Sequence, residues 1–128
     1  MKRALFVVPV LLLVALVAPA VAQDPVKVDS KHYKVEFENA QVRVIRVTYG
    51  PHEKSVMHSH PANVAVFLTD GQGKFTFPDG KTQDIPIKAG SVKWDGGVTH
   101  LPENTGEKPF EVILVELKSS HAKAATKK

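Results

Sequence analysis

Apolar and polar residues alternate in short runs along most of the chain. Residues 33–37 alternate apolar with charged side chains, and residues 42–49 are rich in Val, Ile, Thr and Tyr. Both patterns predict β-strands, because successive strand side chains point to opposite faces of a sheet. Further short apolar runs predict strands at 56–60, 64–69, 74–77, 83–87, 91–94 and 110–117.

Turn signals separate these runs. Gly50-Pro51, the 61–63 segment and Asp70-Gly71 end three of the runs, and Asp79-Gly80 closes a predicted hairpin. Beyond the N-terminal stretch, no segment repeats its apolar residues over a long helical period. Run 64–68 is apolar at both alternating positions, which predicts a strand covered on both faces. The pattern indicates an all-β fold, either a sandwich or a barrel such as a double-sheet jelly roll.

The N-terminal stretch has the pattern of a cleavable signal peptide. Lys2 and Arg3 precede an apolar run at 4–18, and Ala20-Val21-Ala22 forms a small-x-small cleavage site. We therefore expect a signal peptide at 1–22, a folded domain at 31–118, and a disordered basic tail at 119–128. The mature protein is expected to be periplasmic or secreted, with no stable membrane span after cleavage. An uncleaved N-terminal anchor is the alternative that the cleavage site disfavours.

Composition narrows the chemistry. The 128 residues carry a formal net charge of +4, and loss of Lys2 and Arg3 would reduce that excess. Several remaining lysines lie in the tail, and no basic stripe with interleaved aromatic residues is present, so no nucleic-acid partner is expected. The chain has no cysteine, which excludes disulfides, thiolate metal sites and a cysteine nucleophile. A metal would have to use histidine, carboxylate, amide or water ligands.

Three histidines are the main candidates for a site. His58 and His60 form a His-x-His pair on a predicted strand, which puts both imidazoles on one face. His100 follows some forty positions later and adds a third neutral nitrogen donor. Such a set suits a divalent transition metal.

These residues lie within two ordered motifs that resemble those of the cupin superfamily. The first has an upstream glycine, His-x-His and a closing glycine, here Gly50, His58-Ser59-His60 and Gly71. The second runs from Gly90 through Gly97-Val98-Thr99-His100 to Asn104, with Asp95 where the family has proline. The chain thus resembles a small, single-domain, RmlC-like cupin, which implies an all-β double-stranded β-helix, or jelly-roll, barrel.

The resemblance implies that His58, His60 and His100 bind one metal ion inside the barrel. The ion would be Fe, Zn, Mn, Ni or Cu. Cupins have an acidic metal ligand in the first motif, and in this chain Val64 occupies that position, with Ala65 as the alternative. Neither side chain can bind a metal. Three neutral ligands leave the full metal charge of about +2, which favours an anionic substrate, hydroxide or carboxylate as the next ligand.

Six residues near the motifs are further pocket candidates. Val64 is one of them, and it would mark a site that has lost its metal and kept an apolar pocket. Each of the other five has an alternative role. His52 and Glu53 lie in the loop before the histidine strand and could reach the barrel mouth, or remain on the surface. Asn63 adjoins the vacant acidic position but is expected on the other strand face. Trp94 would pack in the core or stack against a ligand. Asn104 would hydrogen-bond loop backbone or substrate.

Other polar residues carry weaker expectations. Arg43 and Arg46 lie on opposite faces of one predicted strand, so only one can face the interior, where it would hold a carboxylate. An outward arginine would be solvated. His32 and His121 lie near the chain ends and are expected to be ordinary polar residues.

Two functional hypotheses follow, and whether the protein is an enzyme stays open. The first is a metal-dependent enzyme acting on a small molecule, with a dioxygenase as one version. The second is a non-catalytic periplasmic module that binds a small anionic or sugar-like ligand. The resemblance also implies a homodimer, since small cupins often pair through sheet edges.

Overall fold

The structure is a computed structural model that describes residues 23–119. The predicted signal peptide at 1–22 and the predicted tail from residue 120 lie outside the described residues. No helix within the described range is long and apolar enough to cross a membrane. The described elements are α1 (Pro25–Val28), β1 (Tyr33–Glu38), β2 (Val42–Tyr49), β3 (His58–His60), β4 (Asn63–Phe67), β5 (Gly71–Thr76), β6 (Thr82–Ile87), β7 (Val92–Asp95), β8 (Val98–Asn104) and β9 (Phe110–Leu117).

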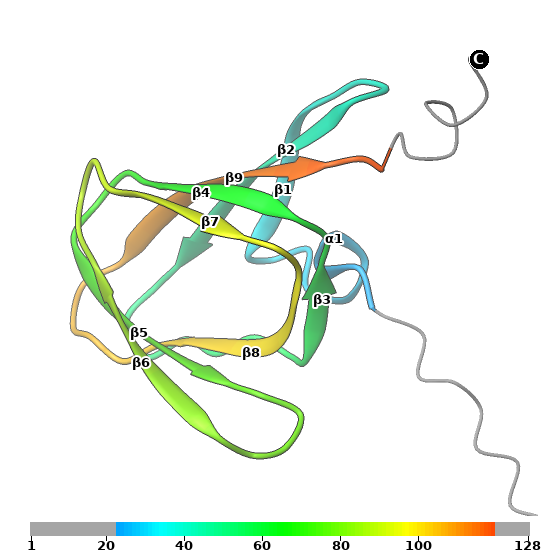
Figure 1. Ribbon diagram of the computed structural model, residues 1–128. Helices are drawn as coiled ribbons and strands as arrows, with labels where there is room; N and C mark the ends of the chain where they lie inside the picture. The colour runs from blue at the N-terminus through cyan, green and yellow to red at the C-terminus, as the bar shows by residue number, and fades with distance from the viewer. Residues whose placement is uncertain (1–22, 120–128) are drawn as a thin grey trace, which may run out of the picture.

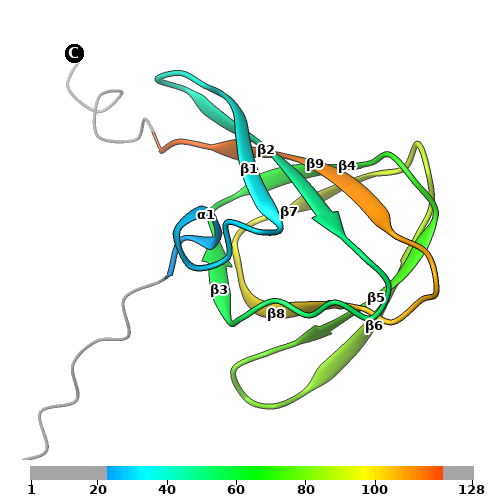
Figure 2. The same cartoon turned by 180° about the vertical axis from the view of Figure 1, so that it is seen from behind.

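The strands form two antiparallel sheets that face each other, as Figures 1 and 2 show from opposite sides. One sheet has the order β1-β2-β9-β4-β7, and the other has the order β3-β8-β5-β6. Neighbouring strands in each sheet are mostly distant in sequence, as in a double-sheet jelly roll. The all-β jelly-roll prediction is therefore confirmed.

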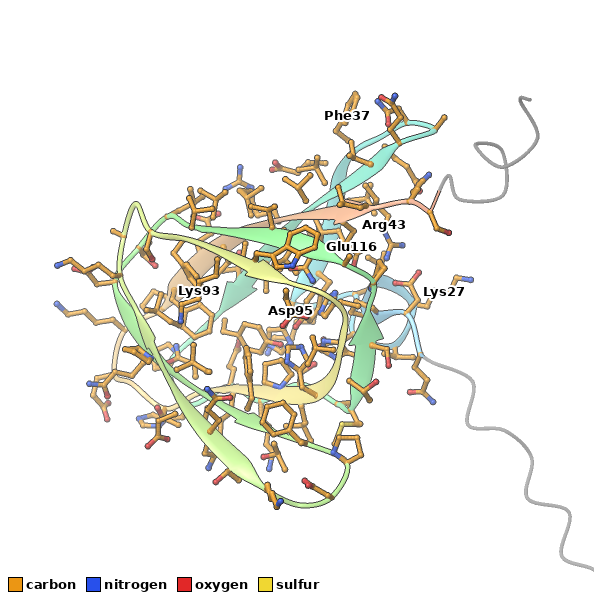
Figure 3. The ribbon with its side chains drawn as sticks, in the orientation of Figure 1. Lys27, Phe37, Arg43, Lys93, Asp95 and Glu116 are labelled. Atoms are coloured by element: carbon orange, nitrogen blue, oxygen red, sulfur yellow. The ribbon has the colours of Figure 1, made fainter. Side chains whose placement is uncertain are left out.

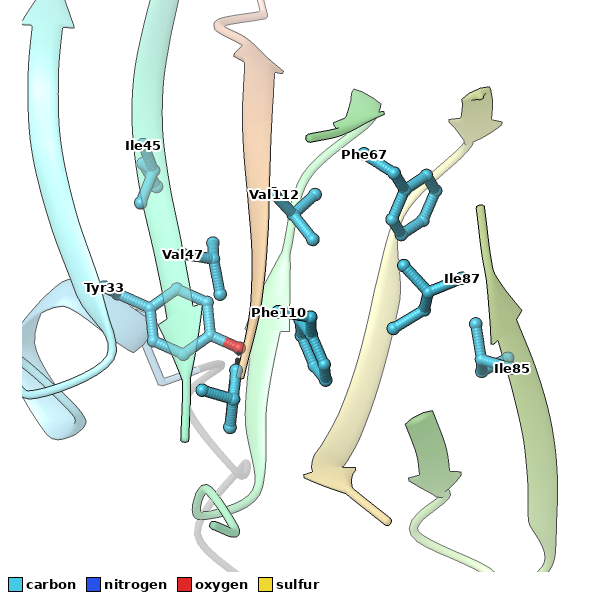
Figure 4. Close-up of a cluster of buried hydrophobic side chains, with 9 residues drawn as sticks. Tyr33, Ile45, Val47, Phe67, Ile85, Ile87, Phe110 and Val112 are labelled. Atoms are coloured by element: carbon cyan, nitrogen blue, oxygen red, sulfur yellow. Dashed lines mark hydrogen bonds between the residues drawn. The ribbon is translucent and has the colours of Figure 1, made fainter. Parts of the chain in front are cut away.

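The hydrophobic core lies between the two sheets and reaches β3, where Tyr33 packs against the ring of His58. Nine buried side chains from both sheets form the hydrophobic cluster (Figure 4): Tyr33, Ile45, Val47, Tyr49, Phe67, Ile85, Ile87, Phe110 and Val112. Strands β2, β6 and β9 each contribute alternate residues, as the period-two pattern predicts. Burial of these apolar groups holds the two sheets together.

Two elements differ from the sequence prediction. No strand was predicted at 98–104, yet β8 pairs with β3 on one side and with β5 on the other. The folded domain was expected to begin at residue 31, yet Pro25 of α1 is fully buried and the Ser59 amide donates to the Gln23 carbonyl. Both errors have one cause, because partners distant in sequence supply the packing and hydrogen bonds of these segments.

Candidate metal centre

Strand pairing brings the three predicted histidines together. His58 lies directly opposite His100 in the β3–β8 ladder, and His60 lies two residues further along the same face of β3. Each of the three histidines offers a ligand nitrogen, and these nitrogens lie within 4.8 Å of one another. All three residues are buried. Gly97 lies between β7 and β8 and has a φ of +123°, which favours glycine. β8 then begins with Val98, which lies opposite His60.

Hydrogen bonds fix the tautomers of His58 and His60. The His58 Nδ1 atom donates to the Val56 carbonyl at 2.8 Å, and the His60 Nδ1 atom donates to Glu116 Oε1 at 2.8 Å. When both imidazoles are neutral each carries one N–H, so both Nε2 atoms then present lone pairs. These atoms lie 3.0 Å apart. Two lone pairs at that distance repel unless a cation or proton lies between them, as a bound metal would.

His100 completes the donor set. Both of its ring nitrogens are buried and lack a hydrogen-bond partner among the described residues, which is costly for a polar group. Burial, with smaller contributions from His60 and His58, lowers the pKa of His100 to about 3. Burial likewise lowers the pKa of His58 to about 4. Both rings are therefore neutral at pH 7 and free to bind a metal, so the residues present fit such an ion.

Glu116 orients His60 from behind and is itself held by Arg43. The Glu116 side chain is nearly fully buried, with Oε1 on His60 and Oε2 accepting from Arg43 Nε at 2.8 Å. Arg43 also binds both carboxylate oxygens of Asp24, at 2.8 and 3.0 Å. Figure 3 shows Arg43 and Glu116 beside the end of the barrel. A carboxylate behind a histidine is the usual arrangement at metal sites, because it fixes the ring and raises its basicity.

A second network reaches His58 from the N-terminal side. His32 lies between Asp29 at 2.7 Å and Glu53 at 2.9 Å, and its ring stacks on Tyr49. Ser55 donates to Asp29 at 2.5 Å and lies 3.3 Å from His58 Nδ1. The prediction of His32 as an ordinary polar residue is wrong, because it is buried between two carboxylates.

Of the two loop candidates, neither lines the cavity beside the histidines. Glu53 is bound by Lys31, His32 and the Gly50 amide, and its pKa is lowered to about 2, chiefly by the hydrogen bond from Lys31. His52 is exposed and pairs with Glu107 at 2.8 Å.

A cavity of about 260 Å³ opens between the sheets beside the histidines. His60 and His100 line it, together with mostly apolar and aromatic side chains from both sheets. Asn63 faces this cavity, contrary to expectation, because the inward residues of β4 are Asn63, Ala65 and Phe67. Val64 is not among the lining residues.

Trp94 adjoins the cavity but is 62% exposed, so it does not pack in the core. Asn104 lies at the far end of β8 and is fully buried. Its amide nitrogen donates to the carbonyls of Gly50 and Lys108, and its Oδ1 accepts from the Gly106 amide. It thus serves the backbone and is not a lining residue.

Glu116 was not among the site residues predicted from the sequence, and the sequence did not decide whether Arg43 or Arg46 faces the interior. A signal for Glu116 was present, because it shares strand parity with Phe110 and Val112 in an otherwise apolar run. A carboxylate on the buried face of a strand requires a partner. Arg43 shares parity with the buried Ile45 and is the inward arginine.

Comparison with known proteins gives a consistent fold. A family model described as "Cupin domain" matches residues 45–116. A search of curated proteins found no significant match. A cupin-domain structure from Bordetella pertussis has a TM-score of 0.64 and 24% identity, over 68% of this chain and 92% of that one. The structure of a protein with a double-stranded β-helix domain from Klebsiella pneumoniae has a TM-score of 0.55 and 18% identity. The match covers 69% of this chain and 76% of that one.

The structure of the DMSP lyase DddQ from Ruegeria pomeroyi is also similar, with a TM-score of 0.52 and 12% identity. The match covers 73% of this chain and 50% of that one. At these identities the likeness to solved structures shows the fold alone.

The buried amide of Asn104 makes a testable contribution to stability. Asn104→Ala removes the donor of two carbonyls and the acceptor of Gly106, and should lower the free energy of unfolding by about 1–3 kcal/mol. Asn39→Ala is the matched control, because Asn39 is exposed and water can replace its bonds. Urea denaturation followed by circular dichroism measures both; equal stabilities for the two variants would contradict this role.

Proposed function

The chain belongs to the cupin domain family, and from this premise we propose that His58, His60 and His100 bind one divalent transition metal ion. The cavity beside them would take a small molecule that completes the ligand set. The observation that carries the proposal is the 3.0 Å separation of two Nε2 lone pairs, with the unpartnered nitrogens of His100 alongside. Two nitrogens bound to one ion at about 2.1 Å lie roughly 3–3.4 Å apart, so the spacing fits a shared ion.

The surroundings favour an ion with open positions. The group that could hold a metal among the described residues contains the three histidines alone. Three neutral histidines would leave the charge of a bound metal uncompensated by its protein ligands, and Glu116 supplies negative charge one hydrogen bond away through His60. Because His60 and His100 line the cavity, a small molecule there would reach the ion's remaining positions.

The residues have separate tasks in this account. The Val56 carbonyl holds the His58 ring and Glu116 holds the His60 ring, so that neither can rotate its Nε2 atom away. The mostly apolar walls lower the polarity of the cavity and so strengthen electrostatic interactions inside it. A bound transition metal supplies Lewis acidity, and iron adds dioxygen chemistry. We propose a metal-dependent enzyme acting on a small molecule, in an exported protein.

Metal content tests the proposal. The purified protein, produced without a metal-binding tag, should retain close to one equivalent of transition metal per chain, measured by plasma mass spectrometry. His100→Ala removes one of three ligands and should lower metal affinity by at least a hundredfold. His52→Ala is the matched control, because His52 is exposed and pairs with Glu107 outside the cluster. An empty wild-type protein that gains no thermal stability from zinc, iron, copper, nickel or manganese contradicts the proposal.

The role of Glu116 is tested by a change that keeps its shape. Glu116→Gln retains a hydrogen-bond acceptor for His60 but removes the charge, and should weaken zinc binding by about 10–100-fold. Glu111→Gln changes a half-buried glutamate of the same strand that pairs with Arg46, and should leave zinc affinity unchanged. Competition with a fluorescent chelator measures both. Equal zinc affinities for Glu116→Gln and the wild type would contradict a contribution of the Glu116 charge to metal binding.

Catalysis is separated from binding by oxygen uptake. The iron-loaded protein should consume dioxygen with at least one member of a panel of thiols, diketones and phenols if it is a dioxygenase. Binding of panel members without turnover would favour the non-catalytic binding module.

A further inference from the structure

Strand β7 carries two charged side chains on the face that lines the cavity. Lys93 lies opposite Ala65 and Asp95 lies opposite Asn63 in the β4–β7 ladder. Opposite residues in an antiparallel pair share a face. All four residues line the cavity, and Figure 3 shows the labelled Lys93 and Asp95 on the barrel side of β7. A cavity that is otherwise mostly apolar thus has a cation and an anion in one wall.

Lys93 lacks an anionic partner. Within residues 23–119, no carboxylate oxygen lies within 4.0 Å of its Nζ atom, whereas Lys74 on β5 pairs with Glu103 at 3.2 Å. The Lys93 Nζ atom lies 6.0 Å from the centre of the Phe67 ring, at the limit of a cation–π contact. Because Lys93 is exposed and also lines the cavity, it lies where the cavity meets solvent. Its charge is available to an anion in the mouth.

The order of residues along the β4–β7 ladder places the cavity-lining side chains at increasing distances from the histidines. Asn63 and Asp95 form the pair near the histidines, because β4 starts three residues after His60. Lys93 is one step further away, and residues two apart on a strand are separated by about 6.5 Å. Phe67 follows on β4, and the far walls are apolar: Ile85, Ile87, Phe110 and Val112.

The charges of Asp95 and Lys93 favour one orientation of a ligand bound in the cavity. Asp95 accepts a hydrogen bond from the Gly97 amide through Oδ1 at 2.7 Å, which holds its carboxylate at the histidine end of the wall. An anionic group of a ligand is repelled by Asp95 and attracted by Lys93. An apolar body between the two ends would contact the aromatic and aliphatic walls.

We propose that the cavity binds a small organic carboxylate with an apolar body, and that Lys93 binds its carboxylate group. This inference rests on the proposed function only in placing the other end of the molecule toward the three-histidine centre. The cavity volume of about 260 Å³ is small for a ligand pocket, which limits the occupant to a compact molecule. Lys93 is thereby the residue that determines substrate charge.

Two probes of equal shape test this assignment. Phenylacetate and phenylacetamide differ in charge, and their binding can be followed by the fluorescence of Trp94, the only tryptophan of the chain and the neighbour of Lys93. The wild-type protein should bind phenylacetate roughly tenfold more tightly than phenylacetamide, both metal-free and zinc-loaded. Lys93→Gln should abolish that preference, and Lys93→Arg should keep it.

Lys88→Gln is the matched control, because Lys88 is an exposed lysine in the β6–β7 connection outside the cavity lining, and the preference should survive there. Circular dichroism checks that each variant folds. Equal binding of the two probes, or no saturable binding of phenylacetate, overturns the proposal. A preference that survives Lys93→Gln but disappears on zinc removal also overturns it, because the carboxylate then binds the metal. A Lys93-dependent preference in protein that binds no zinc supports this proposal while the metal proposal fails.

Discussion

The close approach of the His58 and His60 Nε2 atoms is the constraint on which the rest of the site depends. The 3.0 Å contact places two lone pairs against each other, because each Nδ1 atom is committed to an acceptor. An arrangement of this kind is costly when empty and favourable around a cation. The protein holds it with a backbone carbonyl on one ring and the buried carboxylate of Glu116 on the other.

The supporting groups extend well beyond the histidine strands. Glu116 is oriented by Arg43, which in turn binds Asp24 just before α1, so the N-terminal segment contributes to the placement of His60. Asp29 reaches His58 through Ser55 and also holds His32. The short segment that precedes β1 therefore connects to both histidines of β3 through one or two intermediaries.

The histidine triad and the strands were accessible from the sequence because both depend on local periodicity and on motif spacing. His58 and His60 share a face wherever a strand forms, and the second motif supplied His100. Strand β8 was not predicted because its proline and polar residues are more typical of a loop. Its stability comes from pairing with two neighbouring strands, β3 and β5. The face of Asn63 was predicted wrongly because the motif position at Val64 was expected to face the interior, whereas the alternate residues Asn63, Ala65 and Phe67 do so. The partners of Glu116 and His32 are distant in sequence, so no local pattern identifies them.

The most direct test of the central claim is anomalous X-ray diffraction at the zinc edge from crystals of the zinc-loaded protein. The account predicts one strong anomalous peak, about 2.0–2.1 Å from one ring nitrogen each of His58, His60 and His100, at the wall of the cavity. A peak bound elsewhere on the chain, with the three histidines left without metal, would contradict it.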